Sequence, residues 1–413
     1  MQGETASEPR ALGLCPDRLE RIDGWMRANV AAGKVAGLSV MLARGGKTAF
    51  FRTHGRADIA RDKPFAPDTI ARIYSMTKPL TSVAVMMLYA EGRFQLDDPI
   101  TRFLPEFSDL RVLTGGNRAK FESEPARRPI TIRDLLTHTS GLTYGFMEAT
   151  LVDALYRQNG VDFGEAQDAG LAEVVGRLAR QPLLAQPGAE WNYSVATDVL
   201  GYLVEKISGQ PFDAFLKSRI FDPLNMVDTS FFVPESQRAR FTACYALTPT
   251  GKIVLQDDPE KSRYLNDPSV KSGGGGLVST ADDYMRFCRM LLNGGELDGA
   301  RLLSPKTIRL MTINHLPGGK ELTELSKSLF SEAVFEGLGF GLGFAMTVDQ
   351  ARTKNIGSHG EYFWGGMAST AFWIDPVEDL AVVFMTQLMP STAYPIRREL
   401  RTLVYSAFTE SAA

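Results

Sequence analysis

The stretch that decides the fold is Ser75-Met76-Thr77-Lys78, which places a hydroxyl and an amine three residues apart. Residues 69–74 before it are strand-like, and residues 80–89 after it form an apolar run with the period of a buried helix. Residues three apart on a helix face the same way, with Cβ atoms about 5–6 Å apart, so Lys78 is expected to reach the Ser75 hydroxyl. A serine at a helix N-terminus also has a free backbone N–H and the positive end of the helix dipole beside it. The stretch is compatible with a serine nucleophile and a lysine base, although Ser-x-x-Lys alone is more often a capping serine followed by a solvated lysine, and the other motifs of the chain decide for the nucleophile.

The composition is that of a globular protein with a sizeable core. The chain has 413 residues, of which 44% are hydrophobic and 23% charged, and its net charge is −3. This charge argues against nucleic acid or an anionic membrane as a partner, because both need concentrated positive charge. Cys15, Cys244 and Cys288 lie far apart without metal-like spacing. We expect reduced thiols, no metal and no cofactor.

Nothing in the sequence points to export or to a membrane. The first eight residues have neither the charged nor the apolar region of a secretory signal. No uninterrupted apolar stretch approaches the roughly 18 residues that span a bilayer. The expectation is a cytoplasmic protein, and the oligomeric state stays open.

Strand patterns occur at both ends of the chain and helix patterns between them. An amphipathic helix over 16–32 precedes a hairpin of strands 35–43 and 48–53, and strands 339–348, 368–374 and 380–387 precede a closing helix over 396–410. Thr131 with Asp134 predicts a capping box. Further helices are expected over residues 171–184, 197–208, 212–220, 280–293 and 304–313.

This order predicts an α+β fold in which both termini build one antiparallel sheet and a mostly helical lobe is inserted in the middle. We expect residues 1–74 and 336–413 to form the sheet domain and residues 75–335 the helical domain. A cleft between the two would be the natural ligand site, and Ser75 lies at this junction. Segments 110–128 and 316–332 are expected to be surface insertions, either of which would suit a lid.

Several segments resemble, in order, the motifs of the serine β-lactamase and penicillin-binding-protein superfamily. Residues 135–142 resemble its helix-to-loop signature, and 187–194, with Tyr193, its second catalytic box. Residues 273–283 match its glycine-rich helix entry, and 360–366 its third box. The resemblance covers nearly the whole chain. It is strongest to the class C-like group that includes the family VIII carboxylesterases.

The resemblance implies roles for specific residues. Ser75 would accept the acyl group while Lys78 and Tyr193 share the proton transfers, and the sequence leaves open which of the two is the base. The backbone N–H groups of Ser75 and of Met367, on an edge strand, would form the oxyanion hole. Gly365 and Gly366 would let the substrate approach this strand closely.

Two departures from the β-lactamases indicate a different substrate class. Val195 stands where they have an asparagine, and Trp364 stands where they have a lysine that binds the carboxylate of the β-lactam. An aromatic wall in place of a cation favours neutral, apolar acyl groups. Tyr144 and Phe146 are expected to line the acyl pocket, and His359 to lie near the third box.

The sequence thus predicts a carboxylesterase that cleaves small-molecule esters of short to medium chain length through an acyl-enzyme. A Ser-His-Asp hydrolase is disfavoured, because histidines are few and no Gly-x-Ser-x-Gly elbow is present. The alternatives on the same scaffold are a β-lactamase or D-amino-peptide hydrolase, an acyltransferase or an amidase. An alternative of another class is a catalytically silent binding protein.

Overall fold

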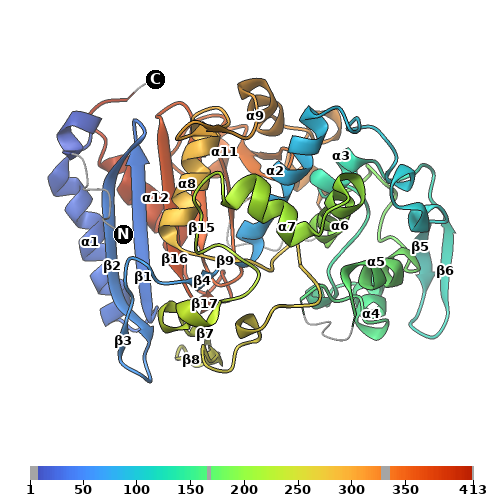
Figure 1. The fold of residues 1–413 in the computed structure, drawn as a ribbon, viewed down its shortest axis with the longest axis horizontal. Helices are drawn as coiled ribbons and strands as arrows, with labels where there is room; N and C mark the ends of the chain where they lie inside the picture. The colour runs from blue at the N-terminus through green and yellow to red at the C-terminus, as the bar shows by residue number, and fades with distance from the viewer. Residues whose placement is uncertain (1–7, 165–168, 327–334, 412–413) are drawn as a thin grey trace.

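A computed structural model describes residues 8–164, 169–326 and 335–411. One large sheet of eight strands runs in the order β12-β13-β14-β15-β16-β1-β2-β3, and all of its pairs are antiparallel (Figure 1). Its strands are β1 (Gly37–Arg44), β2 (Lys47–Asp58), β3 (Lys63–Pro64), β12 (Leu338–Phe340), β13 (Ala345–Thr347), β14 (Tyr362–Gly365), β15 (Ala371–Asp375) and β16 (Leu380–Thr386).

The two ends of the chain meet in the middle of this sheet. β1 pairs with β16, with Leu38 opposite Thr386, and with β2 through the predicted turn at Gly45 and Gly46. Every residue of β1 and of β16 is buried, because helices cover both faces of the sheet. The predicted α+β fold, with a sheet built from both termini, is confirmed.

Different helices cover the two faces. On one face α1 (Pro16–Ala31) packs against α12 (Ile396–Ser406), and both join the apolar cluster of Val40, Val382 and Phe384. On the other face α8 (Ala281–Leu292) packs against β16 and β1, in the same apolar cluster as α2 (Thr77–Ala90). Nearly all of α2 is buried, which is why its sequence is apolar on every side.

The helical part lies on the opposite side of the molecule from α1 (Figure 1). The predicted capping box between Thr131 and Asp134 is confirmed at the start of α3. The predicted helix 171–184 ends earlier, at Ala179, because Pro182 follows. The helices here are α3 (Ile132–Leu136), α4 (Leu151–Gln158), α5 (Leu171–Ala179), α6 (Ala196–Ser208) and α7 (Phe212–Leu216, continued by the π-helical turn Lys217–Phe221). Two further helices, α9 (Pro305–Met311) and α10 (Leu322–Leu325), follow α8 along the chain.

Several short strands pair segments that are far apart along the chain. β7 (Cys244–Leu247), from the predicted helical domain, pairs with β17 (Leu388–Met389) and with β8 (Ile253–Asp257). β4 (Ala71–Arg72) likewise pairs with β9 (Val278–Ser279). The small strands β10 (Glu296–Leu297) and β11 (Ala300–Arg301) form a hairpin of their own. The boundaries after residues 74 and 335 stay a prediction.

One of the expected C-terminal strands needs correction, and the two expected insertions can be described in part. The single strand predicted over 339–348 is a hairpin of β12 and β13, because Gly341 and Gly343 form the turn and Gly343 has φ +99°. Segment 110–128 is largely the hairpin β5 (Arg111–Gly116) with β6 (Phe121–Pro125), at the outer edge of the helical part (Figure 1), and none of its residues lines the cavity that contains Ser75. Of segment 316–332, residues 327–332 lie outside the described residues.

Within the described ranges, no helix combines the length and the apolar character that crossing a bilayer requires.

Candidate active site

Ser75 lies in a strained turn between the sheet region and α2. Residues Tyr74–Met76 form a 3-10 turn, and α2 begins directly after it. Tyr74 has φ +42°, in the left-handed region, which costs a non-glycine residue roughly 1–2 kcal/mol. The expected strand before Ser75 is only the two residues of β4. The tertiary structure thus holds Ser75 in a conformation that its local sequence does not favour.

Lys78 and Tyr193 both reach the Ser75 hydroxyl. Lys78 Nζ donates to Ser75 Oγ at 3.2 Å, and Tyr193 Oη is hydrogen-bonded to the same oxygen at 2.6 Å. Lys78 is buried and donates a second bond to the Gly274 carbonyl at 2.6 Å. The three side chains named from the sequence therefore meet at one atom, although Tyr193 lies 118 residues beyond Ser75.

Aromatic rings hold Tyr193 in place. Its ring stacks on Trp191, with centroids 6.2 Å apart, and contacts His138 and Trp364 at 5.1 and 5.4 Å. Trp364 Nε1 donates to Tyr193 Oη at 3.4 Å. Burial and the charge of Lys78 lower the pKa of His138 well below its usual value, so this ring is neutral. His138 is hydrogen-bonded to Ser194 Oγ through Nδ1 at 3.1 Å, which gives this ring a structural role.

The two backbone amides predicted to form the oxyanion hole are those of Ser75 and Met367. Ser75 and Met367 line the same cavity, and neither amide is hydrogen-bonded to another of the described residues. A Cβ on Gly366 would lie 2.5 Å from the Ile73 carbonyl oxygen, so the end of β14 lies directly against the turn that carries Ser75. β14 is not an edge strand as predicted, because β13 and β12 extend the sheet beyond it. Its last two residues, Trp364 and Gly365, nevertheless have no β13 partner.

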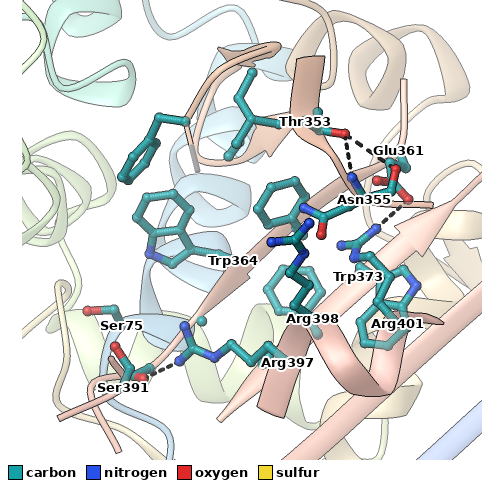
Figure 2. A pocket seen from close by; sticks show the side chains of 18 of the residues that line it. Ser75, Thr353, Asn355, Glu361, Trp364, Trp373, Ser391, Arg397, Arg398 and Arg401 are labelled. Atoms are coloured by element: carbon teal, nitrogen blue, oxygen red, sulfur yellow. Dashed lines mark hydrogen bonds and ion pairs between the residues drawn. The ribbon is translucent and has the colours of Figure 1, made fainter. Parts of the chain in front are cut away.

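A cavity of about 210 Å³ opens at Ser75. Near the hydroxyl its walls are aromatic and apolar, and they include Phe146, Phe335, Leu338 and Trp364. Past Gly366 it continues to the first turns of α12, where the arginines lie (Figure 2). The site therefore offers an apolar chamber at the nucleophile and a charged region beyond it.

Comparison with known proteins agrees with this geometry. Residues 22–406 match the Beta-lactamase family. The chain belongs to the Beta-lactamase family. It is 37% identical to Protein Rv1367c of Mycobacterium tuberculosis, covering 87% of each chain, and 31% identical to Esterase EstB of Burkholderia gladioli, covering 97% of this chain and 98% of EstB. The solved structure of EstCE1, described as a hydrolase with promiscuous acyltransferase activity, superposes with a TM-score of 0.80 at 27% identity, covering 94% of this chain and 98% of EstCE1.

Most of the residues predicted from the sequence to contact the substrate do line the cavity. Trp364, Gly365, Gly366 and Phe146 all contribute to its wall. Tyr144 is not among the described residues that line the cavity. Its ring stacks on that of Phe146, with centroids 4.6 Å apart, and Lys78 Nζ lies 5.2 Å from the centre of the Tyr144 ring.

Val195 and His359 do not reach the cavity. Val195 is buried at the start of α6, and its N–H donates to the Thr143 carbonyl. His359 is exposed in the loop before β14, where Nδ1 bonds the Val348 carbonyl. The cavity wall gives no support to the prediction that these two residues contact the substrate: the Val195 side chain joins the apolar core cluster, and His359 lies outside the wall, so the prediction stays untested.

The sequence reasoning missed Asp198, which lies behind Lys78. Asp198 is fully buried in the first turn of α6, and its Oδ1 accepts hydrogen bonds from Ser272 Oγ at 2.5 Å and from Gly274 N at 2.9 Å. Burial raises the pKa of this carboxyl, an effect that the charge of Lys78 opposes. An acidic residue five positions after Tyr193, directly before the uncharged run of residues 199–204, was the available signal.

It also missed the arginines of α12. Arg397, Arg398 and Arg401 all line the cavity, and Glu361 is the single carboxylate among the described lining residues. Arg401 pairs with Glu361 at 2.6 Å and lies over the Trp373 ring at 4.8 Å (Figure 2). Arg397 bonds the Gly366 carbonyl at 2.7 Å. In the sequence these residues read as the ordinary polar face of a closing helix.

Proposed function

We propose that this member of the Beta-lactamase family is a carboxylesterase that acts through an acyl-enzyme on Ser75. The single observation that carries the proposal is the meeting of Lys78 Nζ and Tyr193 Oη at Ser75 Oγ. A serine hydroxyl is a weak nucleophile unless a neighbouring group takes its proton, and here two titratable groups are within hydrogen-bonding distance.

The reaction has two steps. Ser75 Oγ bonds to the ester carbonyl carbon while its proton passes to the Tyr193/Lys78 pair, and the N–H groups of Ser75 and Met367 bind the oxyanion. The carbon–oxygen bond to the alcohol then breaks, and the pair returns the proton to the departing alcohol. Water adds to the acyl-enzyme with the same groups acting in reverse, which releases the acid and restores Ser75.

The apolar chamber supports an uncharged acyl group of short to medium length. Trp364 occupies the wall where a β-lactamase has the lysine that binds the substrate carboxylate, and Phe146 and Phe335 continue the aromatic surface. Val195 contributes nothing to this argument, since it lies in the core. The likeness to Esterase EstB and the box Trp364-Gly365-Gly366 support placement among the family VIII esterases. A cytoplasmic location remains part of the proposal, to be tested by cell fractionation.

The test compares p-nitrophenyl butyrate with a chromogenic cephalosporin, using wild type, Ser75→Ala and a matched control, Ser39→Ala. Ser39 is a buried serine of β1 away from the cavity. We expect rapid ester turnover that only Ser75→Ala abolishes, with little cephalosporin turnover. Equal rates on both substrates would instead indicate a β-lactamase, and ester turnover that survives Ser75→Ala would refute the acyl-enzyme.

A second candidate function is transfer of the acyl group to an alcohol in place of water. The cavity extends beyond Ser75 to three guanidinium groups and one carboxylate, which is room for a second molecule that carries an acid. The acyltransferase activity named for EstCE1 points the same way. The check is to add a neutral alcohol and a hydroxy acid to the butyrate assay and to measure ester products by mass spectrometry. Products formed faster than butyric acid would favour the transferase.

A further inference from the structure

Asp198 is a buried charge that the proposed reaction has not used. Its side chain is fully buried, and burying a carboxylate costs several kcal/mol unless donors or a cation compensate. Ser272 Oγ and Gly274 N both donate to Oδ1, whereas no described residue donates a hydrogen bond to Oδ2. The charge of Lys78 opposes the effect of burial, which raises the pKa of this carboxyl.

Gly274 connects Asp198 to Lys78. Its N–H donates to Asp198 Oδ1 and its carbonyl accepts from Lys78 Nζ at 2.6 Å, so one residue binds the acid on one side and the amine on the other. A Cβ at this position would collide with Asp198 Oδ2 and would lie 2.9 Å from Tyr144 Oη. The carboxylate and this phenol therefore both crowd against Gly274, which only glycine allows.

The other groups around Lys78 also favour its positive charge. Nζ lies 4.5 Å from the centre of the Tyr193 ring and 5.2 Å from that of Tyr144, both within cation–π range. His138 nearby is neutral. Among the described residues around Lys78, Asp198 is the one with a formally anionic side chain. Asp162 is a more remote acidic neighbour of Asp198.

We infer that Asp198 is a positioning residue whose buried carboxylate, acting through Gly274, keeps Lys78 charged and directed at Ser75. This inference rests on the proposed function. With Lys78 held as the ammonium, the Ser75 proton passes to the Tyr193 oxygen as Ser75 Oγ bonds to the carbonyl carbon. The same phenol then gives the proton to the departing alcohol, and Lys78 stays charged throughout. The ammonium stabilises the phenolate form of Tyr193 that this step requires.

The test is Asp198→Asn, read by the rate at which a fluorophosphonate labels Ser75 across pH. Asparagine has the same shape, and its carbonyl can still accept the bonds from Ser272 and Gly274, so folding should survive. We expect the labelling rate near neutral pH to fall about tenfold or more, as general acid–base catalysis is typically worth 10²–10⁴. We also expect the alkaline limb of the profile to move about one pH unit lower, because Lys78 loses its counter-charge.

Two further variants separate charge from structure. Asp283→Asn neutralises another buried aspartate in the first turn of a helix, which accepts from Thr229 Oγ1 and the Asp228 amide, and should leave the labelling profile unchanged. Asp198→Glu keeps the charge, so its alkaline limb should stay in place even where its rate is lower. An Asp198→Asn profile that matches wild type, or a limb that moves equally in Asp198→Glu, would overturn the inference. Wild type that fails to label at all would instead overturn the proposed function.

Discussion

Replacing Tyr193 with phenylalanine removes one oxygen atom from the site and little else. The phenol oxygen is bonded to Ser75 Oγ at 2.6 Å and accepts from Trp364 Nε1 at 3.4 Å. The ring is only 6% exposed and would keep its contacts with Trp191 and His138. Lys78 would still donate to Ser75 at 3.2 Å, so the hydroxyl is not left without a partner.

The expected effects on activity and on stability differ widely. Loss of a general acid–base group typically costs 10²–10⁴ in rate, which is about 3–5 kcal/mol of barrier. Loss of one hydrogen bond whose partner keeps another costs about 1 kcal/mol of unfolding free energy. We therefore expect kcat/KM on p-nitrophenyl butyrate to fall by at least two orders of magnitude, mainly through kcat, while the unfolding midpoint changes little.

Tyr245→Phe is the matched control. Tyr245 is also buried, and its hydroxyl accepts one bond, from the Ile59 amide at 2.8 Å, on β7 away from the cavity. The assay measures kcat and KM by p-nitrophenol release and stability by urea titration. Tyr193→Phe with kcat within a factor of a few of wild type would show that Lys78 alone activates Ser75. Equal losses of activity in both variants would mean that the effect is structural.

Three further predictions each concern a single residue. Gly366→Ala should reduce the labelling of Ser75 about tenfold or more, because its Cβ would push the Ile73 carbonyl and with it the reactive turn; normal labelling would show that the turn yields. Arg398→Gln should lower kcat/KM about tenfold for an ester that carries a carboxylate and leave butyrate turnover unchanged, and equal effects on both would exclude a charge contact. Burial raises the pKa of Asp283 to about 7 in the folded protein, so the protonated carboxyl stabilises the fold below pH 4. As pH rises to 7, up to about 4 kcal/mol of this unfolding free energy is lost. Urea titrations of Asp283→Asn should lack that loss.

Local patterns in the sequence were sufficient for much of the fold. Two strand-like stretches on either side of Gly45 and Gly46 predicted the hairpin of β1 and β2, and the capping box at Thr131 predicted where α3 begins. These succeeded because turn chemistry and capping act over a few residues. The prediction of a single strand over 339–348 was wrong, because the glycines of this segment form a turn that its apolar pattern does not reveal.

The family motifs named the residues that meet at Ser75, but not what surrounds them. Lys78 was within reach by helical spacing alone, whereas Val195 next to the second box was expected at the substrate and lies in the core. Motif likeness transfers the residue at a position, and the direction of its side chain depends on the packing around it.

By itself the sequence determined the fold class, the family likeness and the trio of Ser75, Lys78 and Tyr193, because these follow from short-range periodicity and ordered motifs. Only the tertiary structure decided that Asp198 lies behind Lys78 and that arginines of α12 line the far end of the cavity. Both facts join segments that are scores or hundreds of residues apart in the chain. Burial and electrostatic coupling depend on distance in space, and no pattern along the chain records that distance.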